Sequence, residues 1–288
     1  MPAPDLEQKR KAETFRALHH SANPLLLVNV WDLASARIIE EAGFSAVATT
    51  SAGIAFSEGH PDGQNIPADR MFARIAQIAS AVCVPVTADV EAGYGADPEG
   101  ASRTTRDLIF AGAVGMNFED ATGDEERPLA DLSWQLERIR AVRETAARFD
   151  VAVVLNARTD VYLLQVGEAA KRYDHALRRL QAFRDAGADC VFVPGLRDAP
   201  TIGRLVTELN CPVNILAGPG SPSVAELAGL GVKRISLGSG PMRSLLGRLR
   251  RLAEEFQTRG TYVALEGAPS YAEINELMKS TRLARAEN

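Results

Sequence analysis

The stretch VPVTADVEAGYG, residues 84–95, contains the pattern that decides the fold. Its apolar run from Val84 to Val90 has a proline near its entrance and acids at its end, and Asp97-Pro98-Glu99 follows shortly after. A proline is tolerated at the start of a strand, and an aspartate before a proline is typical of a helix N-terminus. The stretch therefore predicts a strand followed by a helix.

This alternation recurs along the chain. Short apolar runs predict eight strands, at Leu25 to Val30, Ala46 to Thr50, Val84 to Val90, Val114 to Glu119, Val151 to Ala157, Cys190 to Pro194, Val213 to Ala217 and Arg234 to Leu237. Segments of helical period predict helices at Ala68 to Ala81, Pro98 to Ala111, Leu132 to Phe149, Glu168 to Ala186, Met242 to Arg259 and Tyr271 to Met278. Such units build a parallel sheet, and eight of them fit an α/β fold of the (β/α)8 TIM-barrel type.

A single domain is expected. Residues 1–288 would form one barrel, and residues 261–288 a C-terminal helical tail beyond what one barrel needs. Glycines and a proline, at Gly260, Gly267 and Pro269, separate the last two predicted helices. A neighbouring subunit is the expected packing partner of this tail.

The composition excludes several classes of protein. With 46% hydrophobic and 24% charged residues, the chain is typical of a soluble globular protein. A net charge of -5 argues against nucleic acid as a partner. The chain has no apolar run long enough to span a membrane, and its polar start is unlike a signal peptide, so a cytoplasmic location is expected. The three cysteines, Cys83, Cys190 and Cys211, form no CxxC pair, and we expect them to be buried packing residues.

Acids stand at the ends of two successive predicted strands. Residues two apart in a strand point to the same face, so Asp89 and Glu91 would project together, and Glu119 from the next strand could join them. Three carboxylates on one rim suit a hard ion such as Mg2+. The alternative is that Asp89 and Glu91 only cap the next segment, but Asp97 already supplies a helix cap.

Other polar residues follow further strands, where the active site of a barrel forms. Ser51-Ala52-Gly53 offers small side chains and backbone N–H groups to a carboxylate or phosphate, although a plain tight turn is the alternative. Arg158 could bind a substrate carboxylate with its planar fork. Its alternative is a structural ion pair with Asp160 or Glu119.

A metal ion and a cationic clamp around one small acid indicate chemistry through an enolate, because both stabilise charge that develops on an α-oxygen. The polar connection from Ala121 to Asp131 could act as a lid that shields such an intermediate, or be a solvated loop. Asp62, in the turn Gly59-His60-Pro61-Asp62, would by itself be taken for a turn residue.

Six ordered motifs resemble the isocitrate lyase and phosphoenolpyruvate mutase superfamily, especially its short single-barrel members of the phosphonomutase type. They are Thr50 to Gly53, Gly59 to Asp62, Asp89 to Gly95, Phe118 to Asp120, Ala157 to Asp160 and Pro212 to Asn214. The resemblance spans nearly the whole chain.

The resemblance implies roles for these residues. Asp89 would bind Mg2+ directly, with Mn2+ as a substitute, and Glu91, Glu119 and Asp62 would hold metal-bound waters. Ser51, Ala52 and Gly53 would bind one end of an α-keto acid, Arg158 would bind a carboxylate and take part in catalysis with Asp62, and Asn214 would lie near the same substrate. A homotetramer with exchange of a C-terminal helix is also implied.

The chain departs from this superfamily in its lid. Residues 123–128 read GDEERP and lack the cysteine of the isocitrate and methylisocitrate lyases, and no lysine or asparagine of the mutase lid occurs from Ala121 to Leu132. We therefore expect a Mg2+-dependent lyase that cleaves a C-C bond of a small α-keto or 2-hydroxy dicarboxylic acid, for example in oxaloacetate decarboxylation. The alternatives are a hydrolase or mutase acting on the C-P bond of phosphonopyruvate-like substrates, a keto-acid-binding barrel without turnover, and a sugar-phosphate barrel.

Overall fold

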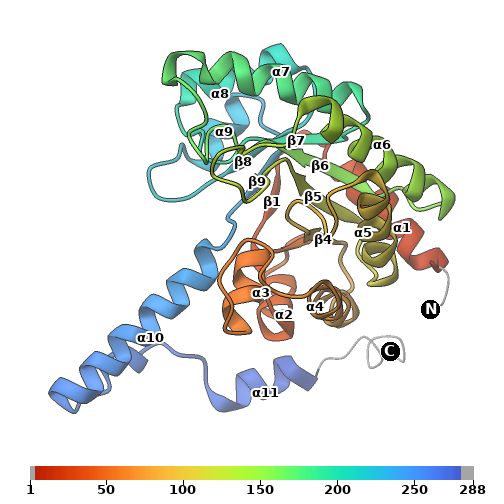
Figure 1. Ribbon diagram of the computed structural model, residues 1–288. Helices are drawn as coiled ribbons and strands as arrows, with labels where there is room; N and C mark the ends of the chain where they lie inside the picture. The colour runs from red at the N-terminus through yellow and green to blue at the C-terminus, as the bar shows by residue number, and fades with distance from the viewer. Residues whose placement is uncertain (1–3, 280–288) are drawn as a thin grey trace.

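A computed structural model describes residues 4–279 of the chain. Nine parallel strands form one sheet in the order β1-β9-β8-β7-β6-β5-β4-β3-β2, which curls into a barrel (Figure 1). The strands are β1 (Leu25–Leu27), β2 (Asn29–Val30), β3 (Val47–Thr49), β4 (Val86–Asp89), β5 (Gly115–Glu119), β6 (Val154–Arg158), β7 (Cys190–Phe192), β8 (Val213–Leu216) and β9 (Arg234–Ser236). The predicted α/β barrel is therefore confirmed.

The first predicted strand differs from the expectation. It is interrupted at Val28, so that β1 pairs with β9 while β2 pairs with β3. Residues 25–30 therefore close the barrel between β9 and β3. The Asn29 side chain fastens this junction, because its Oδ1 accepts hydrogen bonds from the backbone N–H groups of Leu237 and Gly238 at 2.9 and 2.7 Å. Its Nδ2 donates to the Thr49 carbonyl oxygen at 2.8 Å.

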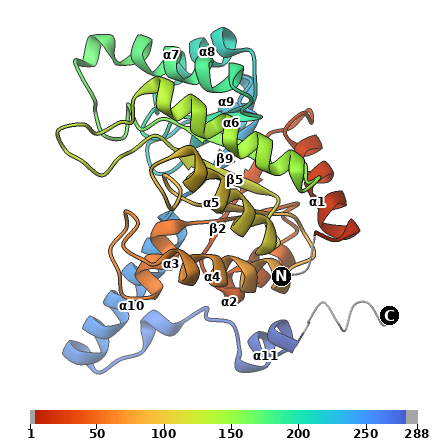
Figure 2. The same cartoon turned by 45° about the vertical axis from the view of Figure 1, so that its right-hand side comes forward.

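Helices surround the barrel on its outside (Figures 1 and 2). They are α1 (Leu6–Leu18), α2 (Leu33–Glu41), α3 (Ser51–Ser57), α4 (Ala68–Ala81), α5 (Pro98–Phe110), α6 (Leu132–Arg148), η1 (Ala169–Lys171), α7 (Arg172–Asp185), α8 (Ala199–Leu209), α9 (Val224–Gly229), α10 (Gly240–Arg259), η2 (Val263–Leu265) and α11 (Tyr271–Lys279). The six predicted helices are present with similar limits.

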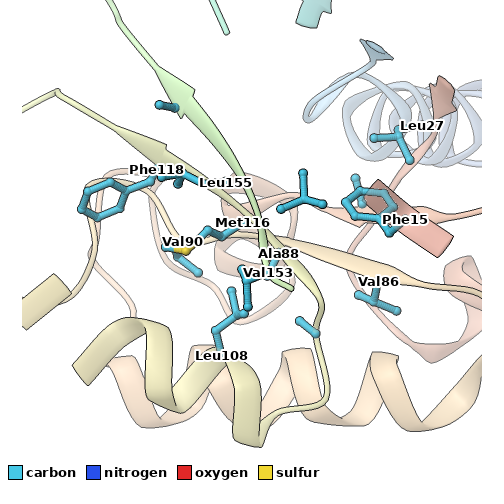
Figure 3. Packing of buried hydrophobic residues seen from close by; sticks show 14 of the residues in the cluster. Phe15, Leu27, Val86, Ala88, Val90, Leu108, Met116, Phe118, Val153 and Leu155 are labelled. Carbon is cyan, nitrogen blue, oxygen red and sulfur yellow. The ribbon is translucent and has the colours of Figure 1, made fainter. Parts of the chain in front are cut away.

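The hydrophobic core lies between the sheet and these helices (Figure 3). Ala88, Met116 and Leu155 stand side by side in register on β4, β5 and β6, and Leu108 of α5 packs in the same cluster. Side chains alternate across a strand, so the neighbouring positions point into the barrel. Burial of Leu108 alone contributes about 2 kcal/mol.

Helix α1 covers one end of the barrel, although the polar sequence of the N-terminus did not predict it. Gln8 donates hydrogen bonds to the carbonyl oxygens of Ile109 and Ala113, just before β5 begins. The fully buried Phe15 fills the space beside Gly115, where a Cβ atom would lie 2.6 Å from the Phe15 ring. A glycine is therefore required at position 115.

The C-terminal arm, residues 240–279, leaves the barrel and turns back beside it (Figure 1). Met242 is the buried residue of α10. The last helix, α11, returns to α2 of its own chain, where Arg37 donates to the carbonyl oxygen of Met278. The rest of the predicted tail, residues 280–288, lies outside the described residues.

Two further expectations can be compared with the structure. Cys190 is buried as predicted, but Cys83 is exposed and Cys211 is only partly covered, because both stand at the turn before a strand rather than within it. Within residues 4–279, none of the helices has the length and apolar character that crossing a membrane would need.

Candidate active site

Asp89 is the last residue of β4 and lies at the carboxyl-terminal rim of the barrel. Its Oδ2 accepts hydrogen bonds from the Ser51 backbone N–H at 3.1 Å and the Ser51 hydroxyl at 2.8 Å. The Asp89 backbone N–H donates to Thr49 Oγ1 at 2.9 Å. Its other carboxylate oxygen, Oδ1, is buried and has no partner among the described residues.

Ser51, Ala52 and Gly53 form the first turn of α3 instead of a loop. Thr50 caps this helix, accepting the Gly53 N–H on its hydroxyl at 3.3 Å, and the Ser51 N–H is taken by Asp89. Of the N–H groups that we expected to be available to a ligand, those of Ser51 and Gly53 are therefore already bonded within the protein. The sequence signal was present, because a threonine before a run of small residues is a good helix cap.

Glu91 follows β4 in a left-handed backbone conformation, with φ of 53°. Its Oε1 accepts the backbone N–H groups of Gly63 and Gln64 at 3.0 and 2.7 Å, and the Tyr94 hydroxyl donates to Oε2 at 3.3 Å. Burial, and then the charge of Asp89, raise the pKa of Glu91 to about 7 despite the hydrogen bonds to its carboxylate. The 58–66 loop is thereby fastened to the end of β4.

Arg158, the last residue of β6, lies between two carboxylates. It contacts Glu119 at 2.7 Å through NH1 and Asp160 at 2.6 and 2.9 Å through Nε and NH2. Burial disfavours the charge of Arg158, but Glu119 and Asp160 outweigh it and raise its pKa. Both ion pairs considered from the sequence are therefore formed. These pairs leave one N–H free on each terminal nitrogen of the guanidinium.

Burial acts on the acids around Arg158 as well. It raises the pKa of Glu119 well above its usual range, because the attraction of Arg158 does not compensate for lost solvation. The Asp62 carboxyl, in the exposed 58–66 loop, lies close enough to respond to Asp89 and Ser51, and burial followed by the Asp89 charge raises its pKa. The structure therefore brings Asp62 to Asp89, which the sequence pattern of the turn did not indicate.

The carboxylates do not converge as three direct ligands on one point. Among residues 4–279, no group of three acidic, histidine or cysteine side chains is arranged to hold an ion together. The unpartnered, buried Oδ1 of Asp89 nevertheless fits a cation, because a buried carboxylate oxygen without a partner is costly. The residues present therefore fit an ion that has one direct protein ligand and whose other contacts are indirect.

The interior of the barrel below this rim is unusually polar. Arg234 of β9 is fully buried, donating to Asn117 Oδ1 at 3.0 Å and approaching His19 Nε2 at 3.4 Å, and Asn156 Nδ2 also donates to Asn117 Oδ1 at 2.7 Å. Barrels are more often filled with branched apolar side chains. The signal that could have found these residues is a polar side chain at every second position of an otherwise apolar strand.

Asn214 belongs to this interior layer. It is the second residue of β8, fully buried, and its Oδ1 accepts from the Ser236 hydroxyl at 3.3 Å. Its Nδ2 has no partner among the described residues. Asn214 is level with Phe192 of β7, which in turn is level with Arg158 of β6.

Residues 121–131, the predicted lid, form an ordered hairpin. Ala121 and Leu129 form an antiparallel bridge, and the Thr122 hydroxyl donates to the Arg127 carbonyl oxygen at 2.5 Å. The hairpin lines a cavity of about 330 Å³ together with the 92–96 loop and α6. The sequence did not anticipate this cavity.

A closed parallel barrel whose carboxyl-terminal rim combines carboxylates with a buried arginine defines a TIM-barrel enzyme site. The chain belongs to the phosphoenolpyruvate phosphomutase family, whose model matches residues 15–257, and thus to the isocitrate lyase and phosphoenolpyruvate mutase superfamily of lyases and mutases. The resemblance inferred from the motifs is confirmed.

Known proteins support this placement. The crystal structure of a Burkholderia cenocepacia J2315 protein, described as a lyase or mutase, is similar with a TM-score of 0.90 and 40% identity, covering 95% of this chain and 97% of that one. An uncharacterized protein of Mycobacterium tuberculosis is 33% identical over 95% of both chains. An oxaloacetate decarboxylase of Chromohalobacter salexigens is 31% identical over 76% of both chains.

Proposed function

We propose that this chain is a Mg2+-dependent lyase that cleaves a C-C bond of a small α-keto or 2-hydroxy dicarboxylic acid, with oxaloacetate decarboxylation as the leading case. The observation that carries the proposal is the buried, unpartnered Asp89 Oδ1 at the carboxyl-terminal rim of the barrel. The similarity to an oxaloacetate decarboxylase supports the choice of substrate class.

The proposed chemistry follows from the groups around Asp89. Breaking the bond between C3 and C4 of oxaloacetate releases CO2 and leaves the electron pair on C3, so that pyruvate forms as its enolate and then takes up a proton. A bound Mg2+ would stabilise the negative charge on the enolate oxygen. Asp89 would bind the ion directly, and Glu91, Glu119 and Asp62 would hold metal-bound waters. Mn2+ could replace Mg2+.

Substrate binding is proposed to use the groups next to this position. Arg158 would direct its two unused N–H donors at a substrate carboxylate, since Glu119 and Asp160 hold its guanidinium in place. The Ser51 to Gly53 turn would bind the keto-acid end, because its small side chains let a ligand approach closely. Asp62, carried by the exposed 58–66 loop, would assist catalysis from the open side.

The assembly and location belong to the same proposal. The exposed apolar side chains of α10, with Leu245 at 55%, Leu249 at 60% and Phe256 at 60% exposure, support packing of the C-terminal arm on another copy of the chain. We propose a homotetramer with exchange of this helix, acting in the cytoplasm on a small acid without nucleic acid or membrane as partner.

The test is a proton and phosphorus NMR time course with Mg2+ and either oxaloacetate or phosphonopyruvate. The wild type should form pyruvate from oxaloacetate faster than uncatalysed decay, and Asp89→Ala should abolish this. Asp5→Asn, which removes an aspartate that caps α1 at the other end of the barrel, is the matched control and should retain activity, as should Cys190→Ala. Full activity of Asp89→Ala would reject the proposal.

A C-P bond reaction is the second candidate, because the matching family is named for a phosphomutase. Release of phosphate or formation of a phosphate ester from phosphonopyruvate would establish it. Tight binding of keto acids without turnover would instead favour a binding protein. The family match leaves the sugar-phosphate alternative without support.

A further inference from the structure

Three side chains in the first turns of α6 bind the backbone of two segments, the loop that follows Glu91 and the end of β5 at Glu119. Trp134 Nε1 donates to the Ala96 carbonyl oxygen at 2.9 Å, and Gln135 Nε2 donates to the Glu119 carbonyl oxygen at 3.1 Å. Arg138 donates through NH2 to the carbonyl oxygens of Ala92 and, at 3.3 Å, Gly95. We call Trp134, Gln135 and Arg138 the α6 bracket.

The members of the bracket support one another. Trp134 and Arg138 are one helical turn apart, and Gln135 and Arg138 are neighbours on the helix surface. Arg138 NH1 donates to Gln135 Oε1 at 2.9 Å, and the guanidinium lies 4.7 Å from the centre of the Phe118 ring, on β5. The bracket therefore ties the loop after β4 and the end of β5 to one helix.

The loop that the bracket holds contains a strained residue. Glu91 has φ of 53°, a conformation that is unfavourable for a non-glycine residue and persists only where the surroundings impose it. Two glycines with positive φ, Gly93 and Gly95, complete the turn, and a Cβ at Gly93 would lie 2.6 Å from Phe118. The Ala92 carbonyl that Arg138 binds belongs to the residue directly after Glu91.

Arg138 is an unusual group for a purely structural contact. It is 4% exposed, and it forms no ion pair with the described carboxylates, although the charges of Asp97 and Asp120 act on it from further away. Burial lowers its pKa, and burying a cation without an ionic partner costs several kcal/mol. Main-chain carbonyl oxygens take the place of an acid. One terminal nitrogen of the guanidinium donates to both of them while the other donates to Gln135, and the single nitrogen of a lysine cannot span these two sites.

We propose that Arg138 is a positioning residue that, with Trp134 and Gln135, holds Glu91 in its left-handed conformation beside Asp89. This inference rests on the proposed function. It also makes α6 the link between the 121–131 hairpin, which directly precedes it, and the turn after Glu91, since the hairpin, residues 92–96, Trp134 and Arg138 line one cavity. Residues that orient the surroundings of a metal change affinity about 10–100-fold when altered.

The test compares two arginines of the same helix. Arg138→Lys keeps the charge but loses the fork. Arg143→Lys alters an arginine whose guanidinium also binds carbonyl oxygens, those of Val153 and Gly187, but pairs with Asp189 and not with a candidate metal-site acid. Mn2+ affinity would be measured by electron paramagnetic resonance, and amide hydrogen exchange by mass spectrometry. Both readouts are independent of turnover.

We expect Arg138→Lys to weaken Mn2+ binding at least tenfold and to speed amide exchange in residues 90–96, and Arg143→Lys to do neither. Trp134→Phe, which removes one donor and keeps a ring, should give a smaller change of the same kind and covers the case in which Arg138→Lys does not fold. Unchanged Mn2+ affinity and exchange in Arg138→Lys, or equal changes in both arginine variants, would overturn the inference.

The two proposals can fail separately. A wild-type protein that binds no Mn2+ would reject the metal site of the proposed function. The positioning role of Arg138 would then be decided by exchange alone, and it would be rejected if residues 90–96 exchange at the wild-type rate in Arg138→Lys.

Discussion

The barrel and the C-terminal arm of this protein bury their apolar side chains to very different degrees. In the barrel, residues such as Leu108, Met116 and Phe183 have no exposed surface. In the arm, Leu249 and Phe256 are each 60% exposed, and α10 contributes a single buried residue over 20 positions. The barrel thus buries its apolar side chains within one chain, and the arm leaves many of its own exposed.

This difference shows how the two regions are stabilised. A helix with little tertiary packing is marginal in water, since most helical stability in proteins comes from burying an apolar face. The exposed leucines of α10 at positions 245 and 249 are one turn apart, so they form such a face. We therefore expect the arm to depend on the proposed contacts with another copy of the chain, whereas the barrel should fold without them.

The largest expected effect concerns buried charge. Arg179 of α7 contacts Asp120, the residue after β5, at 2.6 Å, and Asp120 has no exposed surface. Arg179→Met should lower the free energy of unfolding by about 3–5 kcal/mol, because it leaves a buried charge without its partner. Arg248→Met is the matched change in the arm, where Arg248 binds the carbonyl oxygens of Ala264 and Glu266 at the surface. Urea titrations followed by circular dichroism should show a much smaller loss there, and equal losses would erase the contrast.

Removing one leucine from each region should have the next largest effect. Leu108→Ala should cost about 2–5 kcal/mol of unfolding free energy through loss of packing and the cavity it leaves. Leu249→Ala should leave the unfolding of a dilute sample nearly unchanged but shift the mass distribution measured by light scattering toward smaller species. An unaltered mass at all concentrations would show that the arm is not an interface.

The smallest effect comes from protonation inside the barrel. His19 is buried beside Arg234, and burial lowers its pKa to about 3 from 6.5. The unfolded chain therefore takes up a proton first as the pH falls below 6.5, and the folded protein loses stability until the pH approaches 3. Between pH 7.5 and 5.0 this one group should cost about 2 kcal/mol.

His19→Asn should reduce this loss when urea midpoints at the two pH values are compared. His20→Asn, at the exposed neighbouring position, is the control and should leave the pH dependence as it is in the wild type. The arm from residue 240 to 279 contains no histidine, so this response belongs to the barrel. Equal pH dependence in all three proteins would mean that His19 is not buried in its neutral form.

The sequence predicts the barrel well where its signals are local. The predicted limits of Ala68 to Ala81 coincide with α4, because an apolar face of helical period lies between clear breaks. Helix α1 was missed, since only Lys11, Ala12 and Phe15 are buried along it and its apolar face is narrow. The break at Val28 was missed as well, because it is caused by pairing with two distant strands.

The candidate site, too, could be predicted only where its sequence signals are local. Strand ends place Asp89 and Glu119 on one rim, as expected, but the period-two pairing of Asp89 with Glu91 was wrong, because β4 ends at Asp89 and Glu91 has a left-handed backbone. The ion pairs considered from the sequence as the alternative role of Arg158 are both formed. The α6 bracket could not be found in this way, because its partners are main-chain carbonyl oxygens, which leave no mark in the sequence. The contacts of Arg138 with the 92–95 turn span 43 and 46 residues of chain.

The junction at Asn29 has a consequence for how the chain is made. The hydrogen bond between Asn29 and the Leu237 N–H spans 208 residues. The contact between β1 and β9 that closes the barrel therefore cannot form until most of the polypeptide has left the ribosome. Closing a loop of that length costs about 5 kcal/mol of chain entropy. During synthesis, the segment Leu25–Leu27 must therefore wait with one edge unpaired, and the nascent protein is most exposed to aggregation in the interval before β9 arrives.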